Sequence, residues 1–132
     1  MAVTLETAAR DAACNAIVDL LDVGATMTYP QLQFKTTAGT TAYNNGEVAT
    51  LDFTGATAFG ASSAGVATAG TIASDTTATG GTTVKATLYD QAQAAVLSCT
   101  VGTSGADINL SNNVISAGET VAVSALTVTV PA

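Results

Sequence analysis

Histidine is absent from this chain of 132 residues. Its absence removes the usual general base, the usual base of a catalytic triad and the commonest metal ligand. Serines such as Ser62, Ser63 and Ser104 lie in stretches of small residues and have no base to activate them. Cys14 has no cation or base near it in the sequence that would activate its thiol. The sequence therefore offers no pairing of a nucleophile with a base.

Basic residues are also scarce, and Arg10, Lys35 and Lys85 are the only three. They are scattered, whereas nucleic-acid binding needs clustered Lys and Arg to displace counterions from phosphates. Ten Asp and Glu residues give a net charge of −7, so anionic membranes would repel the chain as well. We therefore expect no nucleic-acid and no membrane partner. The acidic excess favours solubility and a basic protein partner.

Long apolar runs are missing too. No stretch approaches the roughly 20 apolar residues of a transmembrane helix, and residues 1–6 lack the basic region and apolar run of a signal peptide. Cys14 and Cys99 lie far apart without metal-ligand spacing, and we expect two reduced, partly buried thiols rather than a disulfide. The expected product is a soluble protein made in the cytosol.

Large side chains are rare, with three Phe, three Tyr and no Trp. A core of Ala and Val gains less per residue, since stabilisation follows buried apolar area at about 25 cal/mol per Å². We therefore expect neighbouring subunits to supply part of the stability. Sugar binding would use aromatic platforms, but Tyr29, Tyr43 and Tyr89 are not clustered in the sequence. Tyr89, at the end of a predicted strand, is interpreted as an amphipathic packing residue.

Carboxylates are the remaining source of chemistry, because a glycosidase needs only two. Asp52, Asp75, Asp90 and Asp107 fall in or beside predicted turns and could converge at one end of the fold. Asp in a turn usually caps its own backbone. The nearest approach to a calcium spacing is Asp107 with Asn109, which matches no full calcium loop. We expect no catalytic residue, no metal or cofactor site, and a protein that is not an enzyme.

The first 24 residues predict the only helix. Thr4 is a candidate N-cap, Glu6 favours the helix dipole from the first turn, and Gly24 can supply a left-handed residue at the end. Apolar residues recur at helical spacing opposite a polar set, which predicts the buried face. The predicted buried face is Ala9, Ala13, Ala16, Ile17, Leu20 and Leu21, opposite Arg10, Asp11, Asn15, Asp19 and Asp22.

Beyond residue 25 the chain is rich in β-branched Thr and Val, which suit a pleated surface. Leu32 and Phe34 share one face of a strand at 31–36, and Asn44-Asn45-Gly46 is a hairpin signal before a strand at 48–53. The middle, 54–81, predicts strands near Val66 and Ile72 in a packed region rather than disorder.

The last third gives the clearest alternation. A strand at 84–89 is predicted to pair with one at 96–101, and further strands follow near 107–110 and after a turn at 117–119. The apolar phase switches near Ala125, which predicts a bulge or a crossing between sheets. Together these elements predict one domain that is mainly β: an N-terminal helix at 1–24 and a jelly-roll-like β-sandwich at 25–132.

Two groups of residues, at the two ends of the chain, resemble small virion structural proteins of tailed bacteriophages. The likeness weakens over 26–79. The segments that carry it are Arg10-Asp11-Ala12-Ala13-Cys14-Asn15-Ala16-Ile17-Val18-Asp19-Leu20-Leu21-Asp22, Leu88-Tyr89-Asp90, Val101-Gly102-Thr103-Ser104-Gly105-Ala106-Asp107-Ile108-Asn109-Leu110, Ile115-Ser116-Ala117-Gly118-Glu119-Thr120-Val121 and Leu126-Thr127-Val128-Thr129-Val130-Pro131.

The resemblance implies a capsid cement or decoration protein, often jelly-roll-like and often oligomeric. Its partners would be the major capsid protein and copies of itself, and it would lie on the capsid exterior after synthesis in the host cytoplasm. Two alternatives stay open: another virion component (tail, adaptor or fibre-associated subunit), or a β module that binds glycans or a host surface. Copy number per particle separates head from tail, and a glycan array tests the last alternative.

Overall fold

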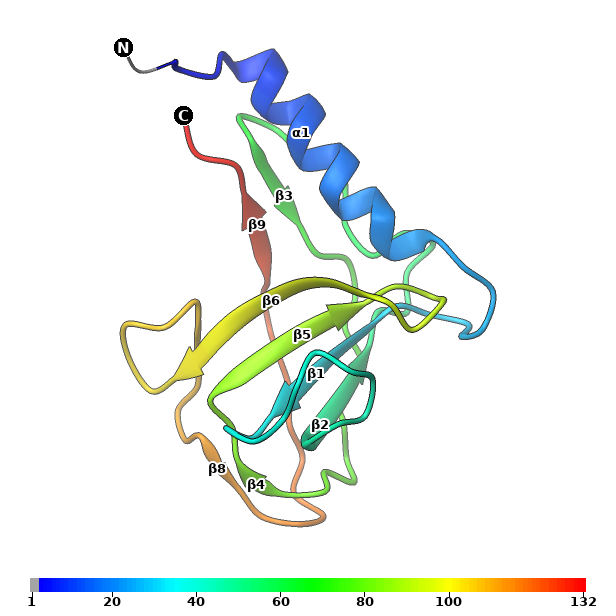
Figure 1. The fold of residues 1–132 in the computed structure, drawn as a ribbon, viewed down its shortest axis with the longest axis vertical. Helices are drawn as coiled ribbons and strands as arrows, with labels where there is room; N and C mark the ends of the chain where they lie inside the picture. Colours follow the sequence, from blue (N-terminus) through cyan, green and yellow to red (C-terminus); the bar gives the residue numbers. More distant parts are fainter. Residues whose placement is uncertain (1–2) are drawn as a thin grey trace.

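The computed structural model describes residues 3–132 and is mainly β with one N-terminal helix, as predicted (Figure 1). The helix, α1 (Thr7–Asp19), continues into a 3-10 turn, η1 (Leu20–Asp22). The strands are β1 (Gln31–Lys35), β2 (Glu47–Asp52), β3 (Val66–Thr68), β4 (Gly81–Thr82), β5 (Lys85–Tyr89), β6 (Ala95–Gly102), β7 (Ile108–Asn109), β8 (Val114–Ile115) and β9 (Thr127–Thr129).

The strands form one curled sheet and two short pairs. The sheet has the order β2-β1-β5-β6-β7, with all neighbours antiparallel except β6 and β7. The pairs are β3 with β9 and β4 with β8 (Figure 1). This arrangement confirms the mainly β class with a single helix. It does not confirm the predicted sandwich or jelly roll, which stays a prediction.

Both predicted hairpins of the sheet are confirmed. β1 pairs with β2, and Asn44 and Gly46 in the connection have φ of 58° and 64°, the left-handed values that Asn and Gly tolerate best. β5 pairs with β6, and the Asp90 carboxylate accepts hydrogen bonds from the backbone N–H of Ala92 and Ala94, each at 2.8 Å. The turn chemistry read from the sequence therefore fixes the centre of the sheet.

The middle segment, 54–81, contains β3 and several single bridges to other parts of the chain. Val66 begins β3, as predicted, but Ile72 forms only a bridge to Phe53. The rings of Phe53 and Phe59 lie 5.7 Å apart and belong to the core. The strands predicted here are thus confirmed in part, because small residues leave little side-chain area to hold a longer ladder.

The end of the chain changes its hydrogen-bond partner from Asp75 to β3, near the position where the apolar phase switches at Ala125. Val121 exchanges two backbone hydrogen bonds with Asp75, at 2.7 and 3.0 Å. Five residues later the carbonyl of Leu126 accepts a bond from the N–H of Ala69, and β9 then pairs with β3. The chain therefore leaves one set of partners and joins another across residues 122–125.

The helix differs from its prediction at its start and in its orientation. It begins at Thr7 with Glu6 as the N-cap residue, which makes no side-chain capping bond, so Thr4 is not the N-cap. The buried residues are Cys14, Val18 and Leu21. Of the predicted buried face, only Leu21 is buried; Ala13 and Ile17 are half-buried, and Ala9, Ala16 and Leu20 are exposed. Asp11, Asn15 and Asp22 bond to the backbone of residues 58–65, and these contacts help to set the orientation of the helix.

Gly24 follows the helix with a φ of +118°, the positive value predicted for it. A β-carbon at this position would lie 2.3 Å from the backbone nitrogen of Ala92, closer than any packing allows. The next residues bind the same turn, since the N–H groups of Thr26 and Met27 both donate to the carbonyl of Gln91. Gly24 is thus required by a close approach of two backbones as well as by its conformation.

Candidate interaction surfaces

A cluster of buried polar side chains lies under the loop 36–46, on the face of β1 opposite the apolar core. Lys35 is fully buried, and its Nζ donates to the carbonyls of Ala42 at 2.7 Å and Asn45 at 3.0 Å. The same ammonium lies 5.1 Å from the centroid of the Tyr89 ring, a cation–π distance. Burial lowers the pKa of Lys35, Lys85 lowers it further, and Glu47 opposes the change.

Hydrogen bonds satisfy the rest of this cluster. The amide of Gln33 both donates to the Asn44 side chain and accepts from the Asn44 backbone N–H, at 2.6 and 3.0 Å. The Tyr89 hydroxyl donates to carbonyls of the loop, and its ring meets Tyr43 edge to face at 5.3 Å. Burial is the main cause that raises the pKa of both tyrosines. Among the described residues no buried side-chain N or O atom lacks a partner.

This cluster changes the view of the aromatic candidates. Tyr43 and Tyr89 do meet in space, but Tyr89 is buried and holds the loop, which confirms its interpretation as a packing residue. Tyr29 is the exposed one of the three, at 38%. The two paired rings therefore stabilise the fold rather than present a flat platform to a sugar.

The helix buries the apolar residues Cys14, Val18 and Leu21 and places a polar stripe beside them, against the body of the protein. The Asp11 carboxylate accepts hydrogen bonds from the Gly65 N–H at 2.6 Å and from the Ser62 hydroxyl at 3.2 Å. Asn15 accepts from the N–H of Ser62, and Asp22 accepts from the N–H of Ala58, at 2.8 and 2.9 Å. These residues satisfy backbone donors of a segment without a regular ladder, which explains why they face inward.

The side of the helix that faces away from these contacts is also mainly apolar. We call it the outer helix face, and it consists of Ala9, Ala12, Ala16, Leu20 and Val23, all exposed. Leu20 and Val23 keep 53% and 54% of their surface accessible. The sequence prediction missed this surface because apolar residues occur on both sides of the helix. The spacing of Asp11, Asn15 and Asp22, four and seven residues apart, is the signal that would have shown a polar stripe.

The three basic side chains each donate a hydrogen bond to a backbone carbonyl of the protein. Lys35 is buried, the Arg10 Nε donates to the carbonyl of Val130 at 2.9 Å, and the Lys85 Nζ donates to the carbonyl of Thr37 at 3.0 Å. Acidic residues outnumber them by ten to three. The protein therefore presents a predominantly negative exterior interrupted by the uncharged outer helix face.

The four aspartates considered for catalysis each accept hydrogen bonds from other residues of the protein. Asp90 caps its own turn, and Asp75 accepts from the N–H groups of Thr50 and Thr77. Asp52 accepts from the Gln31 amide. The described residues contain no group of three or more metal-ligating side chains.

The Asp107 and Asn109 pair, considered for calcium, closes the loop before β7. Asp107 accepts from both the N–H and the hydroxyl of Thr100, at 2.8 Å each, and these bonds lower the pKa of its carboxyl. The Asn109 side chain donates to the carbonyl of Ala106 and accepts from its N–H. The polar atoms of both side chains thus form hydrogen bonds that hold this loop.

The two cysteines are free thiols in the structure, Cys14 in the core and Cys99 half-buried on β6. Burial, with a smaller effect from Asp107, raises the pKa of Cys99 from 9.0 to about 11. Such a thiol is almost entirely protonated at neutral pH and is a poor nucleophile. Cys99 is therefore not a reactive thiol at neutral pH, and its raised pKa reflects its burial.

The described residues leave exposed the apolar outer helix face, and β7 has a neighbouring strand on one side only. The polar groups inside the protein are used to hold loops and the helix in place. Within residues 3–132, no helix has both the length and the apolar character needed to span a bilayer. No protein-family model, no curated protein and no solved structure matches this chain.

Proposed function

We propose that the protein is a capsid cement or decoration subunit of a tailed bacteriophage, acting by adding buried interface to the shell rather than by catalysis. The outer helix face carries this proposal. A helix that keeps Leu20 and Val23 in water, outside its buried stripe, presents an apolar contact surface. Scattered single apolar residues need no explanation, but a row along one helix face indicates a binding site.

The sequence resemblance supplies the partner, the major capsid protein. The outer helix face lacks positive charge, and its rim carries Asp19, which is exposed. The protein's negative exterior adds a long-range preference for a neutral or basic surface. A single contact of this size would be weak, so the mechanism requires many copies acting together on one lattice.

The proposal includes the fold and the location of the protein. A jelly-roll-like fold is part of it, and the mainly β structure with short strands and a curled sheet supports it. The exposed location on the particle and assembly after synthesis in the host cytoplasm follow from the cement role. A tail, adaptor or fibre-associated subunit would differ from a cement protein in its copy number per particle. A glycan-binding module would differ from it in its ligand.

The test is a binding experiment with capsids that lack this protein. Leu20→Asp combined with Val23→Asp places two charges on the outer helix face without touching a buried residue. We expect this variant to keep its far-UV circular dichroism and melting temperature but to lose co-sedimentation with capsids. Val114→Asp is the matched control, because Val114 is 55% exposed and lies away from the helix. Equal capsid occupancy by all three proteins would refute the helix as the anchor.

A copy count on intact particles separates the alternatives. Hundreds of copies per particle support a shell protein, and a few or a few tens indicate the neck or tail. Binding to a glycan array in the absence of any particle contact would instead favour the host-surface role.

A further inference from the structure

The turn that closes the β1–β2 hairpin places a reactive amide beside a backbone nitrogen that can attack it. Asn45 is exposed and is the only asparagine of the chain that precedes a glycine. The backbone nitrogen of the following residue can attack an asparagine side-chain amide, and asparagine is thermolabile for this reason. Glycine offers the least hindered nitrogen because it has no β-carbon. The pair Asn45 and Gly46 therefore supplies both reacting groups.

The nitrogen of Gly46 is free to react. Its N–H donates a hydrogen bond to no described residue. Before an amide nitrogen attacks, it loses its proton, and the negative charge then spreads onto the carbonyl oxygen of the preceding residue, Asn45. That oxygen accepts a hydrogen bond from the Nζ of the buried Lys35 at 3.0 Å. A charged donor at this oxygen stabilises the anion that the loss of the proton creates.

The side-chain amide of Asn45 is polarised as well. Its Oδ1 accepts a hydrogen bond from the backbone N–H of Thr40 at 2.8 Å. Attack at Cγ moves negative charge onto Oδ1, so this N–H stabilises the tetrahedral intermediate in the manner of an oxyanion hole. Both oxygen atoms that gain charge during the reaction thus have a donor before the reaction starts.

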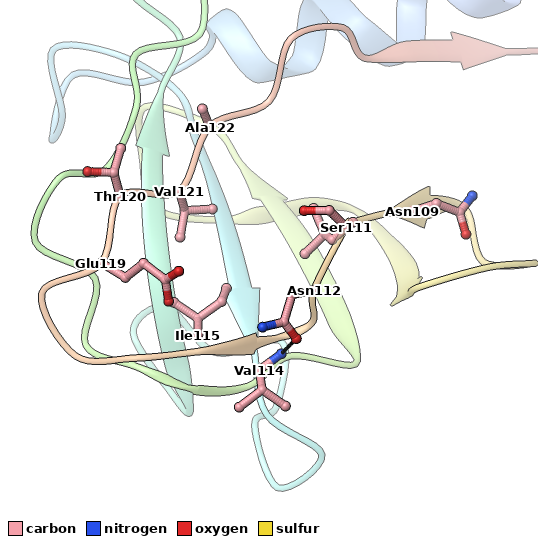
Figure 2. Close-up of a pocket in the computed structure, with 10 residues that line it drawn as sticks. Asn109, Ser111, Asn112, Val114, Ile115, Glu119, Thr120, Val121 and Ala122 are labelled. Carbon is pink, nitrogen blue, oxygen red and sulfur yellow. Dashed lines mark hydrogen bonds between the residues drawn. The ribbon is translucent and has the colours of Figure 1, made fainter.

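Asn44 and Asn112 lack this combination and serve as internal comparisons. The N–H of Asn45, which would attack Asn44, already donates to another carbonyl of the loop at 3.1 Å. Asn112 lines a hollow beside β8, and Figure 2 shows its Oδ1 bonded to the N–H of Val114, at 3.0 Å. The residue after Asn112 is Asn113, whose β-carbon hinders its nitrogen.

From these observations we infer that Asn45 is a site of spontaneous deamidation in the folded protein. The Gly46 nitrogen gives its proton to solvent and bonds to the Asn45 Cγ, while the amide nitrogen takes up a proton and leaves as ammonia. The product is a cyclic imide, a succinimide, and water opens it. Water is the only reactant that the protein does not itself supply. The inference stands independently of the capsid role.

The ring can open in two ways. Addition of water at the Asn45 Cγ breaks the bond from Cγ to the Gly46 nitrogen and gives aspartate. Addition at the former backbone carbonyl of Asn45 breaks its bond to the same nitrogen and gives isoaspartate, in which the main chain runs through Cγ. Either product places a new carboxylate in the loop 36–46, which increases the negative charge of the protein.

The isoaspartate product does not fit the loop. A β-carbon on Gly46 would lie 2.4 Å from the Cα of Gly39, and one on Gly39 would lie 2.9 Å from the carbonyl oxygen of Asn45. Isoaspartate lengthens the main chain at this crowded point and displaces the carbonyl that binds Lys35. We therefore expect isoaspartate to release the loop 36–46 from the polar cluster beneath it, and aspartate to leave the loop in place.

The first experiment follows the folded protein by peptide mass spectrometry during incubation in mildly alkaline buffer. We expect conversion at Asn45, with Asn44 and Asn112 intact over the same period, at a rate at least equal to that of the urea-unfolded chain. Fragmentation that distinguishes isoaspartate from aspartate identifies both products. The inference is overturned if Asn45 stays intact in the folded protein or converts only after unfolding.

The second experiment tests the donor at the Asn45 carbonyl. Lys35→Met removes it, and we expect conversion at Asn45 to slow roughly tenfold, although a merely loosened loop would react faster. Lys85→Met is the matched control, because the Lys85 Nζ donates to the carbonyl of Thr37 in the same loop and should leave the rate unchanged. Rates are compared where urea unfolding shows each variant to be folded. An unchanged or faster rate in Lys35→Met would overturn the role given to Lys35.

The third experiment separates the two products. Asn45→Asp reproduces the aspartate product, keeps an acceptor for the Thr40 N–H and should unfold at the same urea concentration as the unmodified protein. The isoaspartate form, isolated by ion exchange from incubated protein, should unfold at a lower urea concentration. Equal midpoints for the isoaspartate form and Asn45→Asp would overturn the release of the loop.

Discussion

The helix and the first strand place polar and apolar side chains in opposite ways. On β1, Lys35 and Gln33 are completely buried beneath the loop 36–46. On the helical segment, Leu20 of η1 stays in water, while Asp11 and Asn15 of α1 face the protein. In both regions hydrogen-bond partners hold polar side chains against the protein, beside apolar residues that belong to the core. Irregular segments have backbone groups that need hydrogen-bond partners. In a protein with small side chains, this need can outweigh hydrophobicity in setting which side chains face inward.

Removal of the buried cation should have the largest effect. Lys35→Met keeps the aliphatic stem but removes the donor to the Asn45 carbonyl and the cation over the Tyr89 ring, while the Ala42 carbonyl keeps its bonds from the Tyr89 hydroxyl and the Asn45 N–H. The lost hydrogen bond costs about 1–3 kcal/mol and the lost cation–π contact about 1–2 kcal/mol, partly offset by the relief of burying a charge, so we expect a loss of about 2–4 kcal/mol. Urea unfolding measures it. Lys85→Met is the control, expected to cost below about 1 kcal/mol; equal losses would contradict the account.

The helix supplies the second comparison. Asp11→Ala removes the acceptor for the Gly65 N–H and the Ser62 hydroxyl, and we expect a loss of about 1–3 kcal/mol in the free energy of unfolding. Leu20→Ser, on the outer helix face, should change it by less than about 0.5 kcal/mol. Thermal and urea unfolding of both variants check this. If the apolar substitution proved the more costly, the helix would be packed the other way round.

Gly24→Ala tests how the helix is joined to the sheet. A methyl group would collide with the backbone of Ala92, and the backbone would be strained at its φ of +118°. We expect a loss of about 1–3 kcal/mol, in the range of other strained backbone positions. Gly105→Ala is the control, because a β-carbon there meets no atom within 4 Å at a φ of +68°. A smaller loss for Gly24→Ala than for Gly105→Ala would argue against the close approach.

The last effect concerns pH and appears only above about pH 9. The folded protein holds the proton of Cys99 up to a pKa of about 11, whereas the unfolded chain releases it near 9.0. The native state binds more protons between these values, so this contribution to stability is present below pH 9 and is lost as the pH rises toward 11. Cys99→Ser should show a weaker decline over that range. An identical pH profile for both proteins would show that the thiol is not buried as described.

Much of the β architecture could be predicted from sequence because it depends on local signals. The turn at 44–46 and the capping by Asp90 are chemical features of single residues, and the alternation at 84–89 and 96–101 is regular. These features predicted the β1–β2 and β5–β6 hairpins correctly. The mainly β class with one helix followed from the same signals.

The interaction surfaces could not be predicted because they depend on contacts between distant residues. Ala and small apolar residues occur around the whole helix, so its periodicity did not show that Asp11 would bond to residues 51 and 54 positions away. Similarly, the burial of Lys35 depends on a loop that folds back over its own strand. No periodic pattern in one segment contains such information.

The central claim is that the outer helix face seats this protein on a phage shell. A cryo-EM map of the intact particle tests it most directly. The account predicts density for hundreds of copies on the outside of the head, with Leu20 and Val23 against the major capsid protein. Density restricted to the neck or tail, or head density in which α1 points into solvent, would contradict it.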